Sequence, residues 1–185
     1  MTFIFTKIVE LNEAFVNEWK AANSPDFITQ CMFQSIPTIF SAHSVEKGGN
    51  VLGLDSIDRN AIMLLFNIAV KTADEEAVAR PLLRSYGEQM QDFAASKHGL
   101  VDWQFINYAD SYQDPLASYG SDNVEKIRAA ARKFDPKGIF QTKAPGGFKM
   151  SRVGTGSAGV EERDMYGKVG TEAKTAANLS DAYLG

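Results

Sequence analysis

The stretch AIMLLFNIAV, residues 61–70, decides the fold, because both faces of the strand that it would form are apolar. Such a run is typical of a buried strand at the centre of a sheet. Asn67 is the polar exception within it, and a buried amide costs free energy unless it is hydrogen-bonded. Asn67 is therefore either a structural amide or a candidate substrate-binding group.

Three more stretches are rich in β-branched and aromatic residues, and these predict further strands. They are TFIFTKI at residues 2–8, FITQCMFQSI at residues 27–36 and VDWQFINY at residues 101–108. Gln30 and Gln34 are unusual in so apolar a strand. Two such amides indicate either a polar pocket or an edge strand.

A helix is predicted over residues 9–21, where Leu11, Phe15 and Trp19 recur at intervals of four and form one apolar stripe. A longer helix is predicted over residues 74–98 by the same kind of spacing.

Pro81 lies within this longer helix and either starts its regular part or kinks it. A last helix is predicted over residues 123–134, with Asp122 and Glu125 as a candidate capping box at its start.

The predicted order is strand, helix, strand, strand, helix, strand and a final helix. This is the split pattern of a ferredoxin-like α+β fold, an antiparallel sheet with helices packed on one face. We assign residues 1–150 to this domain and residues 151–185, rich in Gly and Ala, to a C-terminal tail. The connection over residues 37–60 is long for a compact domain, and loops of that length are often functional.

Bulk composition excludes several classes of function. A net charge of −4 without a basic stripe argues against a nucleic-acid partner, and no apolar run is long enough to cross a membrane. Cys31 is the sole cysteine, so no internal disulfide forms, and His43 and His98 have no metal-ligand spacing. The first residues lack the features of a signal peptide, so we expect a cytoplasmic protein. Because no metal-ligand spacing is present, we also expect no bound metal.

The candidate site comes from two predicted strands whose alternate residues share a face. Trp103, Phe105 and Asn107 share one face of the strand 101–108, and Tyr108 points to the opposite face. Tyr108 is a candidate general acid or oxyanion donor, or else it anchors a helix. Trp103 and Phe105 are either pocket walls or core aromatics, and Asn107 either donates to a substrate carbonyl or bonds backbone.

The second strand of the candidate site places Gln30, Met32 and Gln34 on one face. Gln34 is a possible catalytic donor beside Tyr108 and Asn107, whereas Gln30, Met32 and Asn67 would bind substrate. His43 lies in the long connection, where it is either a proton carrier or a solvated loop residue.

The C-terminal half of this region resembles the berberine-bridge-enzyme-like FAD-linked oxidases, especially fungal ones. The resemblance lies in the ordered set NYAD, QDP, SYG, DPKGIFQ and PGGFK between residues 107 and 149, with GGNVLGLD before it. It covers residues 3–150, which in that family form the substrate-binding domain. It implies the antiparallel fold predicted above and a site near Asn107 and Tyr108.

Two departures from this resemblance change the expected chemistry. The family's FAD-binding domain, which precedes this region, is not found in the sequence, and KGGN and APGGF do not replace its phosphate-binding turns. The family's YxNY motif often supplies its first Tyr as catalytic base, but this chain has FINY, with Phe105 in that place.

We therefore expect an enzyme of fungal specialised metabolism that uses no cofactor and closes or isomerises a polyketide-like small molecule. Two alternatives stay open: half of an oxidase whose FAD is bound by a separate chain, and a metabolite-binding subunit without catalysis. A sheet face that lost its cofactor domain would expose apolar area, so we also expect a homodimer.

Overall fold

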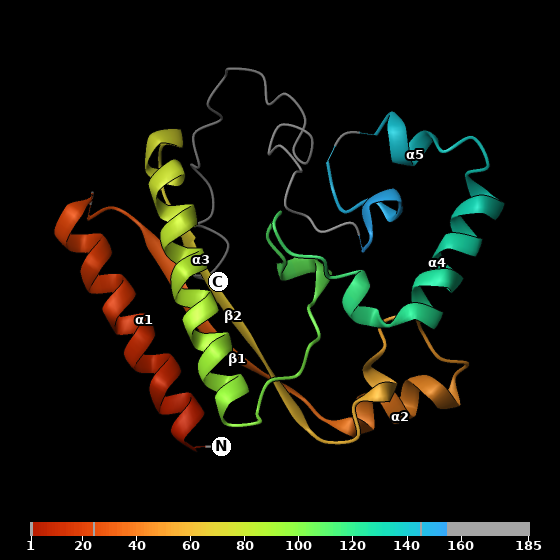
Figure 1. Cartoon of the computed structure of the whole chain (residues 1–185), viewed down its shortest axis with the longest axis horizontal. Helices are drawn as coiled ribbons and strands as arrows, with labels where there is room; N and C mark the ends of the chain where they lie inside the picture. The colour runs from red at the N-terminus through yellow and green to blue at the C-terminus, as the bar shows by residue number, and fades with distance from the viewer. Residues whose placement is uncertain (1, 24, 145, 155–185) are drawn as a thin grey trace, which may run out of the picture. The chain divides into compact units, whose positions relative to one another are not determined.

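The computed structural model describes residues 2–23, 25–144 and 146–154 (Figure 1). The chain forms two compact units. The first, here called the helix–sheet unit, contains the chain up to residue 35 together with residues 62–101. The second, here called the loop-rich unit, contains residues 36–61 and the described chain from residue 102 onward.

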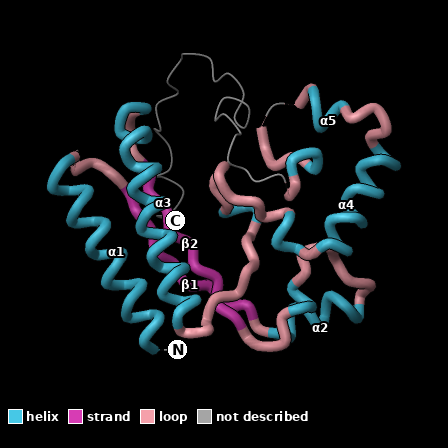
Figure 2. The backbone as a smooth tube through the Cα atoms, in the orientation of Figure 1, coloured by secondary structure: helices cyan, strands magenta, loops and turns pink. Residues whose placement is uncertain are grey.

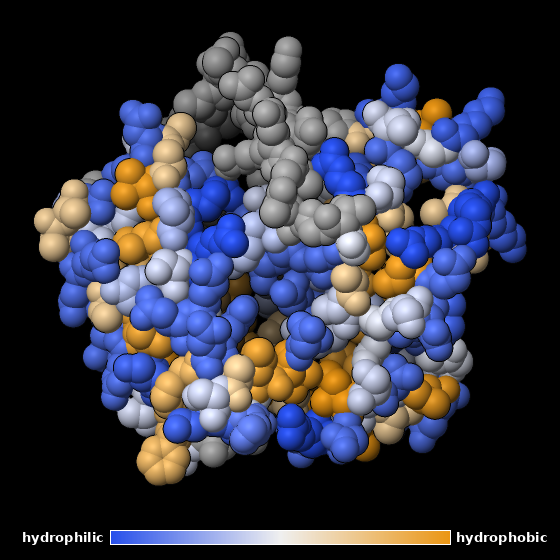
Figure 3. All heavy atoms as spheres, in the orientation of Figure 1, coloured by the Kyte–Doolittle hydropathy of each residue, from blue (hydrophilic) through white to orange (hydrophobic). Residues whose placement is uncertain are grey.

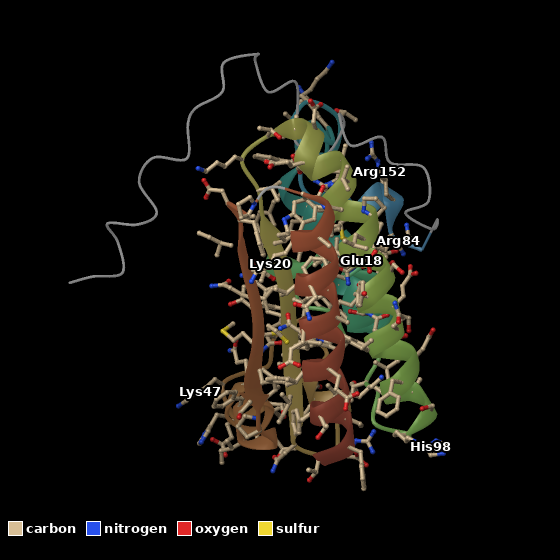
Figure 4. The ribbon with its side chains drawn as sticks, turned by 90° about the vertical axis from the view of Figure 1, so that its left-hand side faces the viewer. Glu18, Lys20, Lys47, Arg84, His98 and Arg152 are labelled. Atoms are coloured by element: carbon tan, nitrogen blue, oxygen red, sulfur yellow. The ribbon has the colours of Figure 1, made fainter. Side chains whose placement is uncertain are left out.

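The helix–sheet unit consists of two long helices on a two-stranded antiparallel sheet. Its elements are α1 (Thr2–Ala22), β1 (Ile28–Ile36), β2 (Ala61–Ala69) and α3 (Ala73–Ser96). Both helices lie on the same face of the sheet, which is clearest in the view turned by 90° (Figure 4). The predicted α+β class, with helices packed on an antiparallel sheet, is confirmed.

The core of this unit lies between the two helices and the sheet. Ile8 and Leu11 of α1 and Met90 of α3 are buried together, with side chains of both strands packed against them. Phe15 is fully buried, and its ring meets those of Phe66 and Tyr86 edge to face at 5.0 and 5.7 Å between centroids. Such aromatic pairs contribute about 0.5–1.5 kcal/mol each beyond the area that they bury.

The helix α3 begins at a complete capping box. The Thr72 side chain accepts a hydrogen bond from the Glu75 amide at 3.1 Å, and the Glu75 carboxylate accepts one from the Thr72 amide at 3.1 Å. Pro81 lies inside the helix, eight residues past its first residue, so it does not start the helical run. At the other end His98 takes a left-handed φ of 54° and Gly99 donates to the Ala94 carbonyl.

The loop-rich unit contains short helices joined by irregular chain, as the tube in Figure 2 shows for its loops. The α-helices are α2 (Thr38–Glu46), α4 (Ser121–Phe134) and α5 (Ile139–Thr142). The 3-10 turns are η1 (Leu54–Ser56), η2 (Ile106–Tyr108), η3 (Ala117–Tyr119) and η4 (Met150–Arg152).

The prediction of a strand at residues 2–8 was wrong, because these residues form the first turns of α1. Ile4 and Ile8 extend the stripe of Leu11, Phe15 and Trp19 toward the N-terminus at helical spacing, and Ile4 packs against the core cluster. Burial along one helix face outweighed the β propensity of these residues.

The prediction of a strand at residues 101–108 was also wrong, and its backbone hydrogen bonds show why. The amide of Gln104 donates to Ser118 Oγ at 3.0 Å, and the amide of Ile106 donates to the Tyr119 hydroxyl at 3.3 Å. These donors are satisfied by side chains rather than by a neighbouring strand. The four-stranded ferredoxin-like order is therefore not formed by the described residues, and β2 pairs only with β1 among them.

Two smaller predictions for helix ends and the tail have different outcomes. The helix α4 starts at Ser121 after Gly120, with no side-chain cap, and Glu125 pairs with Arg132 instead of closing a capping box. The predicted tail falls almost wholly outside the described residues, which end with η4 and Gly154. None of the described helices is both long enough and apolar enough to span a membrane.

Candidate functional site

The face of the sheet turned away from α1 and α3 carries the first group of candidates. Cys31 and Phe33 of β1 and Leu64 and Phe66 of β2 contact the helical layer. Side chains alternate along a strand, so the intervening residues lie on the opposite face, here called the outer sheet face. It consists of Gln30, Met32, Gln34, Met63, Leu65 and Asn67.

A cross-strand amide pair lies on the outer sheet face. Asn67 Nδ2 donates to Gln30 Oε1 at 3.1 Å, and the backbone carbonyl of Asn67 accepts from Thr29 Oγ1 at 2.7 Å. This geometry leaves Gln30 Nε2 as a donor and Asn67 Oδ1 as an acceptor without a partner among the described residues. The sequence-predicted binding residues Gln30 and Asn67 are thus brought together, and the pair presents complementary polar atoms.

Apolar side chains surround this amide pair. Met32 is 41% exposed, and Met63 and Leu65 are partly buried on the neighbouring strand. Gln34 lies on the same face and is exposed. A few polar groups set in an apolar wall are the usual composition of a small-molecule site.

A cluster of stacked aromatic rings forms the second group of candidates, in the loop-rich unit. Trp103 stacks on Phe105 at 6.0 Å and on Tyr119 at 6.4 Å, with interplanar angles of 19° and 26°. Tyr108 meets Phe105 edge to face at 5.2 Å. Trp103, Phe105, Tyr108 and Tyr119 are here called the aromatic ladder.

The turn before η1 contacts two residues of the aromatic ladder, Trp103 and Tyr119. Trp103 Nε1 donates to the Leu52 carbonyl at 2.8 Å. Gly53 adopts a φ of 74°, and a Cβ at this position would clash with the carbonyl of Tyr119. Glycine is required here both by the left-handed backbone and by the close approach of the Tyr119 backbone.

The hydroxyl groups of the two ladder tyrosines have different surroundings. Tyr119 is buried, its hydroxyl accepts from the Ile106 amide, and burial raises the pKa of the phenol. Tyr108 belongs to the short turn η2 and is 43% exposed, with no hydrogen bond from its hydroxyl within the described residues. Tyr108 therefore has a ring held by Phe105 and a hydroxyl available to a ligand.

Asn107 and His43 are both exposed and are less constrained than the ladder residues. Asn107 occupies the middle of η2, where the sequence placed it on a strand face with Trp103 and Phe105. That shared face is not formed, because residues 101–108 are not a strand. His43 lies on α2, and its Nδ1 is 3.3 Å from Glu46 Oε2.

The predicted candidates thus fall into two groups, one in each unit. Gln30, Met32, Gln34 and Asn67 share the outer sheet face of the helix–sheet unit, as their alternation predicted. The loop-rich unit brings Trp103, Phe105 and Tyr108 together by stacking rather than by strand alternation.

Sequence analysis missed Tyr119 and the turn at Leu52 and Gly53. The GG and LG pairs of GGNVLGLD were the available signal, since a glycine can mark a close approach of two backbone segments.

A shallow hollow lies beside α2 in the same unit. It has an empty volume of about 210 Å³ and is lined by apolar and hydroxyl side chains and by Arg59. Because this volume includes open solvent, the hollow encloses far less space than the roughly 300–1,000 Å³ of a usual small-molecule pocket. None of the predicted site residues lines it.

The described residues do not fit the pyrophosphate of FAD. Such a group needs backbone amides in a glycine-rich turn between a strand and a helix N-terminus. Gly48 and Gly49 instead follow the end of α2, so they do not lie between a strand and the start of a helix. The first turn of α3 carries three acidic residues, whose charges oppose a phosphate group. No metal cluster of three or more His, Cys, Asp or Glu occurs in the described residues either.

Comparison with known proteins finds relatives among fungal enzymes. The chain is 38% identical over 144 residues to FAD-dependent monooxygenase drtC of Aspergillus calidoustus, a match covering 77% of this chain and 27% of the relative. It is 33% identical over 132 residues to FAD-dependent monooxygenase sdcF of Emericella nidulans, covering 71% and 28%. It is 29% identical over 119 residues to the bifunctional solanapyrone synthase of Alternaria solani, covering 64% and 23%.

The chain spans about a quarter of the length of these relatives. No protein-family profile and no solved structure matches it. The expected likeness to fungal FAD-linked enzymes is therefore confirmed at the level of these relatives, and over only part of their length.

Proposed function

We propose that this chain is the substrate-binding part of a biosynthetic enzyme related to fungal FAD-dependent monooxygenases. The outer sheet face carries this proposal, because it sets the Gln30–Asn67 amide pair among Met32, Met63 and Leu65. Such a wall would bind an apolar small molecule and orient a carbonyl or hydroxyl group on it.

The open atoms of the amide pair define which substrate groups fit. Gln30 Nε2 would donate to a substrate carbonyl, and Asn67 Oδ1 would accept from a hydroxyl. A polyketide-like molecule carries both groups on an apolar chain, so its chemistry matches this face. Gln34, four residues beyond Gln30 on β1, offers a second donor to the same substrate.

The aromatic ladder of the loop-rich unit is a separate candidate for catalysis. The Tyr108 phenol can donate to an oxygen on which negative charge develops, while Asn107 beside it offers an amide N–H. Phe105 holds the Tyr108 ring edge to face, which limits the positions that the hydroxyl can reach. Trp103 in turn supports Phe105 by stacking.

The reaction that we propose first is a cyclisation, cycloaddition or isomerisation without a redox cofactor. Two observations favour it. Phe105 stands where the oxidases that this chain resembles often have a catalytic Tyr, and Gly48 and Gly49 follow a helix instead of leading from a strand into one. Holding two reacting ends of a flexible substrate together can supply several kcal/mol of the barrier, up to roughly 7–11 kcal/mol. Polarisation of a substrate carbonyl by a hydrogen-bond donor would lower the barrier further.

The alternative is a redox reaction in which FAD is bound by a separate chain. The printed names of the relatives favour it, since two of those compared are FAD-dependent monooxygenases. In that case Gln30 and Asn67 would still bind and orient the substrate. A third possibility is that the chain binds a metabolite without converting it.

A spectroscopic titration separates these alternatives. The purified chain is mixed with increasing FAD while flavin absorbance and fluorescence are followed, and then incubated with the linear precursor of the host pathway. No flavin binding, with a product of unchanged mass and a new ring, would support the cofactor-free enzyme. Saturable FAD binding by the chain alone would refute it, and precursor that binds without conversion would support the binding subunit.

A further inference from the structure

The strand β1 has one edge that no other described strand covers. It pairs with β2 alone, and within residues 2–23, 25–144 and 146–154 no further backbone hydrogen bond reaches its other edge, here called the β1 edge. Six of the nine residues of β1 are exposed, against two of nine in β2, so β1 is the more open side of the sheet. An uncovered edge presents a row of amides and carbonyls that can pair with another strand.

The β1 edge lacks the side chains that usually prevent two edge strands from pairing. Native edge strands are commonly protected by Lys, Pro or other residues that oppose pairing. The nine residues of β1, ITQCMFQSI, include no charged residue and no Pro. Hydrophobic residues also reach the surface elsewhere, between hydrophilic ones (Figure 3), but Ile28 and Met32 are exposed on a strand without any charge. The β1 edge is therefore suited to pairing with a strand of similar composition.

The sequence of β1 is chemically symmetric about its central residue, Met32. From either end the strand has Ile, then a hydroxyl residue, then Gln, and then Cys or Phe before the central Met. A two-fold interface needs such self-complementarity, because the same patch meets itself. Antiparallel pairing of two copies about Met32 joins Ile28 to the partner's Ile36, Thr29 to the partner's Ser35, Gln30 to the partner's Gln34, Cys31 to the partner's Phe33 and Met32 to the partner's Met32.

The backbone of β1 permits this register. Alternate residues of a strand direct their amides and carbonyls to opposite edges. Each of the pairs above joins two even-numbered or two odd-numbered residues, so the groups that point away from β2 in one copy meet those of the other.

We propose that two copies of this chain pair through their β1 edges, antiparallel and centred on Met32, and that this pairing completes the substrate site. The two sheets join into one antiparallel sheet with the two β1 strands at its centre. Pairing at the edge leaves the outer sheet face uncovered, so a substrate can still reach it. Because β1 has no charged residue, the dimer is held by backbone hydrogen bonds and apolar contacts, not by ion pairs.

The pairing brings together two amides that one chain keeps apart. Within one chain Gln34 lies four residues from Gln30, about 13 Å along the strand. In the dimer Gln34 of the partner subunit lies opposite Gln30, with about 4.5–5.5 Å between their Cβ atoms. The partner's Gln34 therefore extends the Gln30–Asn67 pair into a row of three amides, and each site combines residues of both copies. This shared site rests on the proposed function, whereas the pairing of the β1 edges does not.

Cysteine cross-linking of the full chain tests the pairing and its register. All variants carry Cys31→Ala, which removes the native thiol. Opposite Cα atoms of an antiparallel pair are about 4.5–5.5 Å apart, within the range of a disulfide, so Met32→Cys should form a covalent dimer on mild oxidation. Gln30→Cys and Gln34→Cys should each form no disulfide alone and should cross-link when mixed. Val78→Cys, at an exposed side chain of α3, is the control for random collisions and should not cross-link.

Mixing two binding variants tests whether the site is shared. Gln30→Leu and Gln34→Leu each remove one amide from every shared site, so each alone should bind the linear precursor about tenfold more weakly than the wild type. A mixed dimer has one site with both amides and one site with neither. Random mixing should therefore restore about a quarter of the wild-type sites. If both amides of a site came from one chain, mixing would restore none, and the shared site would be rejected.

Light scattering of the wild type should show a dimer that does not weaken as salt increases, since no ion pair holds it. This measurement needs no variant, and circular dichroism checks that the cysteine variants fold. Three results would overturn the inference: a wild type that stays monomeric at about 100 μM, assemblies larger than a dimer, or folded Gln30→Cys and Gln34→Cys proteins that do not cross-link when mixed.

The same experiments separate this inference from the proposed function. Binding of the linear precursor by a wild type that is monomeric would reject the inference alone. Cross-linking in the predicted register by a protein that binds no precursor would reject the proposed function alone.

Discussion

At the scale of single residues, Tyr108 is where a small change should have a large chemical effect. Its hydroxyl is available while its ring is held by Phe105. In Tyr108→Phe the ring contact remains and the proton donor is lost, so turnover of the precursor should fall about tenfold or more at unchanged stability. Product formation under saturating precursor measures this, and a rate equal to that of the wild type would remove Tyr108 from the mechanism.

Substitution of Gly53 tests how much its close contact with Tyr119 of the aromatic ladder stabilises the fold. Its left-handed φ and the nearby Tyr119 carbonyl leave no room for a Cβ, so Gly53→Ala should destabilise the fold by about 2 kcal/mol or more. Gly49→Ala is a close control, because Gly49 has a similar φ of 80° but nothing within 4 Å of the added Cβ. Its cost should stay near 1 kcal/mol. Urea unfolding compares the two, and equal losses would mean that the close approach to Tyr119 contributes nothing.

At the scale of elements, α3 depends on the capping box at its start. Thr72→Ala removes the side chain that accepts from the Glu75 amide, which should cost about 1 kcal/mol of unfolding free energy. Ser121→Ala at the first residue of α4 is the control, because α4 has no side-chain cap. Its effect should stay within about 0.5 kcal/mol. The urea midpoints of the two variants check this, and a similar shift in both would contradict the role of Thr72.

The elements also show what the sequence could and could not predict. The apolar stripes predicted α3 and α4 and most of α1, and the runs at residues 27–36 and 61–70 predicted β1 and β2. Residues 2–8 were wrongly predicted because their composition favours a strand, whereas Ile4 and Ile8 continue a helical stripe that only packing reveals. In such cases burial in the tertiary structure outweighs the β propensity of the local sequence.

For the candidate site too, the sequence predicted how residues lie on the strands but not how they meet in the loops. Gln30, Met32, Gln34 and Asn67 were placed on one face by simple alternation, and the strands keep that alternation. The aromatic ladder could not be predicted, because Trp103 and Tyr119 meet through a loop whose hydrogen bonds go to side chains. Contacts of this kind produce no periodic pattern in the amino-acid sequence.

At the scale of the whole molecule, the proposed homodimer can be measured directly. Apolar side chains such as Ile28 and Met32 remain exposed on the first strand, and burying them against a second copy would be favourable. We expect a mass near 40 kDa by light scattering, twice the 20.3 kDa of one chain. Met32→Asp should shift the protein toward the monomer, and a wild type that stays monomeric at 100 μM would exclude the homodimer.

Pro81 has a consequence for how α3 opens. A proline offers no amide to the carbonyl four residues before it, so Ala77 lacks its helical donor in the middle of a helix of 24 residues. The turns before Pro81 are held by the capping box of Thr72 and Glu75 and by the small buried side chain of Ala79. The turns after Pro81 are held by the larger buried side chain of Met90 and by Ala94. Deuterium should therefore enter the first two turns of α3 well before the rest, so that one continuous helix would behave as two segments with separate opening free energies.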